Sequence, residues 1–223
     1  MCRPLSGPDA GHVDRDQAPA IGHSPYPGVV SPDAPLQGTA SLRVLSTGYL
    51  GERFASTVTF VRDGAALIVV NPGMVADIES ILGPLRNLGV RPSAVTDVVL
   101  LAARPAHIVN AALFPGARLH DATAVYQDDR KARRPADRFL ISPSVRLIET
   151  PGHHPDDLTM LVATPRGIVA VTHLWSSRSD DAEWPPDGDP GTLRRAKTRV
   201  LGVASRIVPA HGAAFRAGPD IPV

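Results

Sequence analysis

The chain has 223 residues, 43% of them apolar, and its formal net charge at pH 7 is +1. This length is typical of one domain with a sizeable core, and the balanced charge predicts no nucleic acid or membrane surface as a partner. Cys2 is the single cysteine, which excludes an internal disulfide and a multi-cysteine zinc site. No apolar run reaches the roughly 18 residues of a membrane span, and no signal peptide is evident, so we expect a cytoplasmic protein.

Residues 1–39 differ in composition from the rest of the chain. They are rich in Pro, Gly, Asp and Ala and show no apolar periodicity. This composition predicts a flexible N-terminal arm, with residues 40–223 forming the domain. The arm could exchange between two copies of the chain, which would give a homodimer.

The first half of the domain is predicted to alternate between strands and helices. Apolar patterning predicts strands over 42–46, 56–61 and 66–70, with a hairpin turn at Asp63-Gly64. The third of these strands is apolar throughout, which predicts burial on both faces. A helix is predicted over 75–88, and a strand over 96–101 then leads into a loop and a short helix.

The second half is predicted to be richer in strands. Short strands are expected at 117–119 and 124–126, with His120 in the turn between them. The charged run 128–138 favours a solvated loop, the alternative being a flap that faces an anion. Further strands, the last helix and the last strand are predicted over 139–141, 145–149, 158–163, 168–171, 190–204 and 207–208.

Four histidines share one local context, because each follows an apolar strand. They are His107, His153, His173 and His211. Loops at strand ends can converge on one edge of a sandwich of sheets, and imidazole suits zinc, iron, copper or nickel. Singly, each is more often a packed or surface histidine, but four in the same context favour a shared metal site. His154 adjoins His153 and is a second choice for its role.

The order of elements resembles the metallo-β-lactamase-like hydrolase superfamily. The phrases that carry the resemblance are Asn71-Pro72-Gly73 after a buried strand, His107-Ile108-Val109-Asn110, Thr150-Pro151-Gly152-His153 and Pro209-Ala210-His211-Gly212. The resemblance covers roughly residues 42–215. It implies an α+β fold, a four-layer αββα sandwich of two mixed β-sheets flanked by helices, with a metal centre at one edge.

The family signature H-x-H-x-D-H is degenerate in this chain. Ala102 and Arg104 stand where the family has its first two histidines, and Ala106 replaces the aspartate. His107 keeps the last signature position, and His153 and His211 also match family ligands. His173 replaces the aspartate that bridges two metals.

This pattern has a physical consequence for the metal content. Two dications repel strongly at short distance and need anionic bridges, which positions 106 and 173 no longer supply. The resemblance therefore implies at most one divalent metal, zinc first and iron as the alternative, bound by His107, His173 and His211 with His153 in support.

Three residues are candidates for catalysis: Arg104, His153 and Asp157. Arg104 cannot bind a metal, but its planar guanidinium can bind a carboxylate or phosphate. An ion pair with Asp156 or Asp157 is an equally good interpretation of Arg104. Carboxylates beside ligand histidines more often orient them than act on substrate, and this applies to Asp157.

We expect an enzyme acting on a small anionic substrate by hydrolysis or a related lyase or isomerase step. Two alternatives stay open. One is a metal-free pseudoenzyme or binding module, suggested by the missing signature ligands. The other is a metal-independent acid/base catalyst that uses a histidine beside Arg104. Trp175 and Trp184 could line the pocket, although packing is the commoner role.

Overall fold

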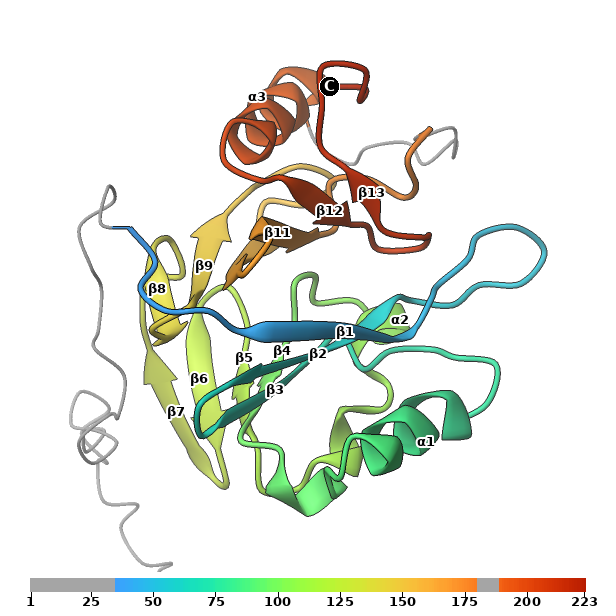
Figure 1. Cartoon of the computed structure of the whole chain (residues 1–223), viewed down its shortest axis with the longest axis vertical. Helices are drawn as coiled ribbons and strands as arrows, with labels where there is room; N and C mark the ends of the chain where they lie inside the picture. The colour runs from blue at the N-terminus through green and yellow to red at the C-terminus, as the bar shows by residue number, and fades with distance from the viewer. Residues whose placement is uncertain (1–34, 180–188) are drawn as a thin grey trace, which may run out of the picture.

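The computed structural model describes residues 35–179 and 189–223, which form two β-sheets packed face to face (Figure 1). The seven strands of the first sheet are neighbours in chain order: β1 (Ser41–Ser46), β2 (Val58–Asp63), β3 (Ala66–Val70), β4 (Asp97–Val99), β5 (Arg118–His120), β6 (Ala124–Gln127) and β7 (Arg130–Arg133). The six strands of the second sheet follow the same rule: β8 (Phe139–Ser142), β9 (Val145–Glu149), β10 (Leu158–Thr164), β11 (Gly167–Thr172), β12 (Arg206–Val208) and β13 (Phe215–Arg216).

Both sheets are mixed, because three connections cross over and return in parallel. The β3–β4, β4–β5 and β11–β12 pairs are parallel, and the other neighbouring strands are antiparallel. A parallel pair needs a long connection. The helical elements of these crossovers are α1 (Glu79–Asn87), η1 (Pro92–Ala94), α2 (Pro105–Ile108), η2 (Ala111–Leu113) and α3 (Pro190–Leu201).

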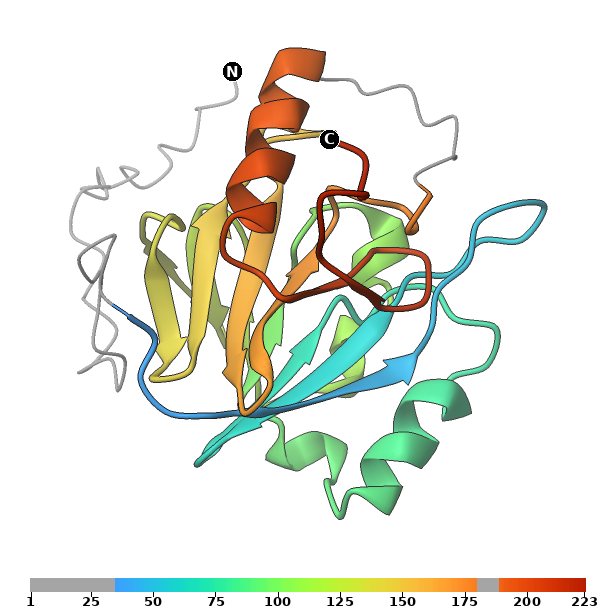
Figure 2. The same ribbon diagram turned by 45° about the horizontal axis from the view of Figure 1, so that its top comes forward.

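Three apolar layers hold the sandwich together. The largest lies between the sheets, where Val70, Leu147 and Met160 are buried. Ile81 and Leu85 of α1 pack on the outer face of the first sheet, and Ala196 and Val200 of α3 pack on the outer face of the second. Each large apolar side chain buried in this way contributes about 1.5–3 kcal/mol. The order helix, sheet, sheet, helix confirms the predicted αββα sandwich (Figure 2).

Strand β3 shows how the sequence pattern sets these layers. Ile68 and Val70 face the other sheet, whereas Val69 between them faces α1. Alternation along a strand sends successive side chains to opposite faces, so a continuous apolar run is what a strand buried on both faces requires. The predicted burial of this strand is confirmed.

Helix α1 begins later than the apolar pattern predicts. It starts at Glu79 rather than residue 75. Asp77 lies just before the N-cap residue Ile78, and its Oδ1 atom accepts a hydrogen bond from the Glu79 N–H at 3.0 Å. A carboxylate that accepts a nearby backbone N–H competes with helical hydrogen bonds at its own position and stabilises the first turn that follows. The helix therefore begins after Asp77.

Two predictions about the segment after β4 are wrong. Within the charged run, Arg130–Arg133 forms strand β7, which pairs with β6 from Gln127↔Arg130 to Ala124↔Arg133. Charged side chains suit β7 because it is an edge strand. His120 is not in a turn but ends β5, where it is buried and its Nε2 lies 2.8 Å from the Asp97 Oδ1 atom.

Other predicted features have simpler outcomes. Trp175 packs in the core under α3, and its Nε1 donates to the Pro222 carbonyl at 2.8 Å. Trp184 and residues 1–34 of the predicted arm lie outside the described residues. Gln37 donates its N–H to the Pro143 carbonyl at 3.0 Å, so the end of the predicted arm is attached to the domain. No helix in the described ranges has the length and apolar character to cross a membrane.

Candidate metal centre

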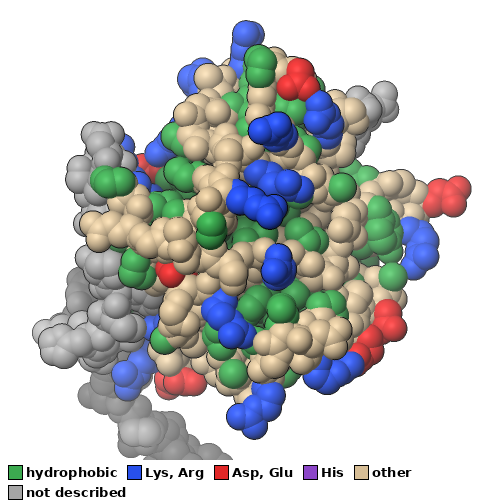
Figure 3. Space-filling model, in the orientation of Figure 1, with side chains coloured by type: hydrophobic (Ala, Val, Ile, Leu, Met, Phe, Trp, Pro, Cys, Tyr) green, Lys and Arg blue, Asp and Glu red, His purple; other side chains and the backbone are tan. Residues whose placement is uncertain are grey.

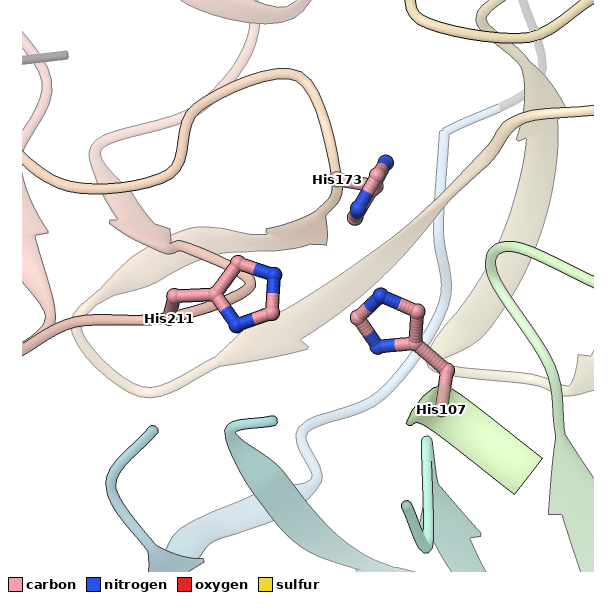
Figure 4. A group of neighbouring side chains, drawn as sticks. All are labelled: His107, His173 and His211. Carbon is pink, nitrogen blue, oxygen red and sulfur yellow. The ribbon is translucent and has the colours of Figure 1, made fainter. Parts of the chain in front are cut away.

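Three buried histidines meet at the edge of the sandwich where strands of both sheets end. His107 lies in α2, His173 directly follows β11, and His211 lies in the loop after β12. Figure 4 shows the three rings pointing toward one another. One possible ligand atom from each lies within 4.8 Å of the other two, and the ring centroids are 4.8, 5.2 and 6.0 Å apart.

His107 is positioned by the start of a very short helix. Pro105 occupies the first turn of α2, where a proline costs no hydrogen bond and its fixed φ favours the helix. The backbone N–H of His107 donates to the Arg104 carbonyl at 2.9 Å. The turn therefore fixes the backbone that carries His107, and burial fixes its side chain.

The segment from Leu101 to Asn110, which contains α2, is fastened to the turn after β3 by two asparagines. Asn71 Oδ1 accepts a hydrogen bond from the Leu101 N–H at 2.9 Å, and Asn110 Nδ2 donates to the Gly73 carbonyl at 2.7 Å. Asn71 has a φ of 48°, a conformation that asparagine adopts more readily than most residues. These two bonds hold the His107 loop from both ends.

Gly73 allows the turn after β3 to approach the backbone of Ala106 and His107 closely. A Cβ atom added to Gly73 would lie 2.0 Å from the Ala106 carbonyl oxygen and 2.5 Å from the His107 Cα atom. The Met74 N–H donates to that same Ala106 carbonyl at 2.7 Å. The predicted turn at Asn71-Pro72-Gly73 therefore needs glycine for close backbone approach rather than for an unusual φ.

His211 has a fixed tautomer. Its Nδ1 lies 2.9 Å from the Ala55 carbonyl oxygen, which only accepts, so Nδ1 carries the proton and the Nε2 lone pair is available. The Phe54 ring packs on the His211 ring at a centroid distance of 4.5 Å. Such a contact to a backbone carbonyl is the usual arrangement for a metal-binding histidine.

His173 is oriented from the second sheet. Its Nδ1 lies 3.7 Å from the Asp157 Oδ2 atom, and this oxygen accepts the His154 N–H at 2.9 Å. Below the site, the hydroxyl groups of Thr150, Thr159 and Thr172 form a buried chain with distances of 2.9 and 2.7 Å. This chain ties together the strand ends from which His153 and His173 extend.

Burial keeps two of the three imidazoles neutral. Desolvation, followed by the nearby His173 and His211 and then by Arg104, lowers the pKa of His107 from 6.5 to about 2. Desolvation also lowers the pKa of His211 to about 4, although the bond to Ala55 opposes it. Neutral imidazole is the form that binds a metal, so the lone pairs are available at neutral pH.

The other predicted site residues surround this group. His153 is buried, and its ring centroid lies 5.4 Å from that of His173, but it is outside the set of three. His154 is also outside that set. Arg104 is half-buried and its charge contributes to the lowered pKa of His107. The Asp157 Oδ2 atom lies 3.7 Å from the His173 Nδ1 atom, beyond hydrogen-bond distance, so its orienting role stays a prediction.

The residues present fit a metal ion. The buried Nδ1 atom of His107 has no hydrogen-bond partner among the described residues, which costs about 1–3 kcal/mol. A cation would satisfy this kind of donor atom. Ligands of tetrahedral zinc are about 3.4 Å apart, so the three rings need to close by about an ångström around an ion.

Comparison with known proteins agrees with this fold. No family model matches the chain. Metallo-beta-lactamase domain-containing protein 1 from Homo sapiens is 34% identical over 167 residues, covering 67% of this chain and 59% of that protein. The Xenopus laevis protein of the same name is 29% identical over 193 residues, covering 79% and 81%. The chain thus spans about three fifths of the human relative's length.

Solved structures share the architecture. A Thermotoga maritima protein assigned to the metallo-beta-lactamases has a TM-score of 0.66 at 20% identity, covering 80% of this chain and 100% of that one. A protein in a di-iron-bound form has a TM-score of 0.57 at 17% identity, covering 78% and 95%. An N-acyl homoserine lactone hydrolase with product at its catalytic metal centre has a TM-score of 0.54 at 16% identity, covering 73% and 84%. The identity to the metallo-beta-lactamase domain-containing proteins, together with this shared fold, shows that the chain belongs to the metallo-β-lactamase superfamily.

Sequence reasoning missed three contributors to the site. Phe54 and Ala55 contact His211 from a loop 156 residues earlier, counted from Ala55. Asn71 was identified only as part of a turn, whereas its side chain holds the loop that leads to His107. A polar residue directly after a buried strand is the pattern that could have identified Asn71.

Proposed function

We propose that this chain is a metal-dependent enzyme of the metallo-β-lactamase superfamily that binds one divalent ion through His107, His173 and His211. The observation that carries the proposal is the convergence of three buried histidines whose ligand atoms lie within 4.8 Å of one another. Relatives of this fold include a hydrolase with a catalytic metal centre and a di-iron protein, which supports metal chemistry in this class.

One ion is proposed rather than two because the anionic bridges are missing. Position 106 is alanine and position 173 is histidine, so no carboxylate stands at either of these two signature positions. Two dications in contact need negative charge between them. Ala102 and Arg104 also remove two ligands that a second ion would use.

Zinc is the proposed ion, and iron is the alternative. Imidazole ligands carry no negative charge, so three of them would leave the full charge on the ion, which favours a bound hydroxide or an anionic substrate. When bound, the ion would supply a Lewis acid that polarises the substrate or lowers the pKa of water. The reaction proposed is hydrolysis, or a related lyase or isomerase step.

The chain's own residues would divide the remaining tasks. Asp157 orients His173, and the Ala55 carbonyl orients His211. Arg104 directly precedes α2, and its guanidinium would hold an anionic group of the substrate. His153, one ring further from the centre, would support the metal site or contact the substrate.

Metal content of protein purified without added metal tests the ligand set. We expect about one zinc or iron per chain in the wild type, and loss of that metal in His107→Ala, His173→Ala and His211→Ala. The control is His120→Gln, which changes a buried histidine bound to Asp97 outside the group of three. A wild type that takes up no metal under any loading condition contradicts the proposal and favours the metal-free alternative.

Binding of inorganic phosphate to the metal-loaded protein tests the role of Arg104. Because charged hydrogen bonds are worth about 1.5–3 kcal/mol, Arg104→Ala should weaken phosphate binding by about tenfold or more. Arg91→Ala, which removes an arginine from another short helix start, is the matched control. Equal affinity in wild type and Arg104→Ala, measured by calorimetry, removes Arg104 from the site.

A further inference from the structure

A groove lined by arginines lies at the opposite end of β11 from the histidines. It runs between the edge strand β1, the β10–β11 turn and β12, and its cavity volume is about 620 Å³. Figure 2 shows β1 passing the tip of the β10–β11 hairpin. Arg166 precedes the six residues of β11 and His173 follows them, so the charged rim of the groove lies about 20 Å from the candidate metal centre.

The rim of the groove is positively charged. Arg43, Arg166 and Arg206 line it, and all three are exposed. Arg216 is the strand partner of Arg206 and adds a fourth charge beside the groove. No acidic residue appears among the described lining residues, and Figure 3 shows Lys and Arg side chains gathered over β12 and β1 on this face. Within the described ranges no carboxylate forms an ion pair with these arginines.

The floor of the groove is apolar and one wall is backbone. Leu42, Val169, Val208 and Ala214 contribute apolar side chains to the lining. The Ala40 N–H already points toward the second sheet, donating to the Ala163 carbonyl at 2.8 Å. Because backbone groups alternate along a strand, the N–H and C=O groups of residues 42 and 44 lie along this same free edge of β1.

We propose that this groove binds an acidic peptide segment, which adds as a strand to the free edge of β1. The backbone edge supplies hydrogen bonds for an extended chain, as in other cases of strand addition. Alternation in the bound strand would place apolar side chains on the floor and carboxylates toward Arg43, Arg166 and Arg206. A single-stranded nucleic acid fits less well, because none of the described lining residues is an aromatic on which bases could stack.

A fluorescein-labelled peptide of alternating glutamate and valine, six residues long, is the probe for this proposal. We expect saturable binding to the full chain below about 1 mM peptide, weakened by added salt. The same peptide with lysine in place of glutamate should not bind. If the lysine peptide binds equally, or if the acidic peptide does not bind by about 1 mM, the proposal is wrong.

Removing charges tests whether the peptide binds in this groove beside β1 or at β7, the other edge strand of the first sheet. The triple variant Arg43→Gln, Arg166→Gln, Arg206→Gln should bind the acidic peptide about 30-fold more weakly, at about threefold for each exposed charge. The matched control, Arg130→Gln, Lys131→Gln, Arg133→Gln, removes three charges from the edge strand β7 and should bind like the wild type. Equal losses in the two variants overturn the groove assignment.

Two further measurements test the kind of partner and the mode of binding. Hydrogen exchange at Leu42 and Val44 should slow when the acidic peptide is bound, because their N–H groups become strand donors. Binding without such protection contradicts strand addition. A single-stranded DNA probe that binds more tightly than the peptide at equal salt overturns the peptide assignment in favour of nucleic acid.

Discussion

At the scale of single residues, the candidate centre depends on imidazoles that stay neutral. The low pKa values of His107 and His211 arise first from desolvation, which disfavours the charged form. The sequence could identify these histidines, because each follows an apolar strand. It could not predict their pKa values, because desolvation depends on how tightly residues from both sheets pack around each ring.

This burial has a measurable effect on stability. The pKa of His107 is about 2 in the folded chain against 6.5 when exposed, so below pH 6.5 the unfolded chain binds a proton that the folded chain does not. The metal-free protein should therefore lose stability as the pH falls, by up to about 1.4 kcal/mol per pH unit for this histidine. His107→Gln lacks this pH-dependent contribution. Its free energy of unfolding, measured with urea at about pH 7, 6 and 5, should therefore fall less steeply as the pH is lowered. Equal slopes in the two proteins contradict the burial argument.

Asn71 offers a second test with a single side chain. Asn71→Ala removes the acceptor for the buried Leu101 N–H and places alanine at a φ of 48°. We expect a loss of about 2–3 kcal/mol in the free energy of unfolding, from the unpaired donor together with the strained backbone. Asn71→Gly tolerates this φ and should lose about 1 kcal/mol less, as measured by chemical denaturation. The reverse order would contradict the backbone strain at this φ, and an unchanged stability in Asn71→Gly would show that the side chain does not hold the loop.

At the scale of elements, periodicity predicted most strands and their order, because a buried strand has a recognisable pattern. The strand over 66–70 is an example, since its continuous apolar run matches burial on both faces. Periodicity failed to predict β7, because an edge strand of charged residues has no apolar pattern to detect. Contacts between loops, such as Phe54 on His211, carry no local pattern either.

Two glycines provide a matched pair at this scale. Gly73→Ala would place a Cβ atom 2.0 Å from the Ala106 carbonyl, so we expect it to lose about 3 kcal/mol of stability and to weaken metal binding by moving the loop of His107. Gly83→Ala lies inside α1 with its nearest atom outside the helix backbone 3.8 Å away; the helix propensity it gains is opposed by Pro84, which follows it, so stability should change by less than about 1 kcal/mol. Thermal unfolding and metal titration compare the two. Similar effects of both substitutions would contradict the close approach at Gly73.

At the scale of the whole molecule, two sheets bring distant segments to one edge. His107 comes from the first sheet's side of the sandwich, and His173 and His211 come from the second. The order of motifs predicted this edge through a family resemblance, and the fold confirms the class. The distances among the three rings depend on how one sheet packs on the other. No local sequence pattern encodes that packing.

Anomalous X-ray diffraction from crystals of protein purified without added metal, collected on either side of the zinc or iron absorption edge, tests the central claim most directly. We expect a single anomalous peak between the rings of His107, His173 and His211, with imidazole nitrogens about 2.0–2.1 Å from zinc. Two peaks a few ångströms apart, a peak that leaves His173 unbound, or three empty imidazoles in metal-soaked crystals would contradict it.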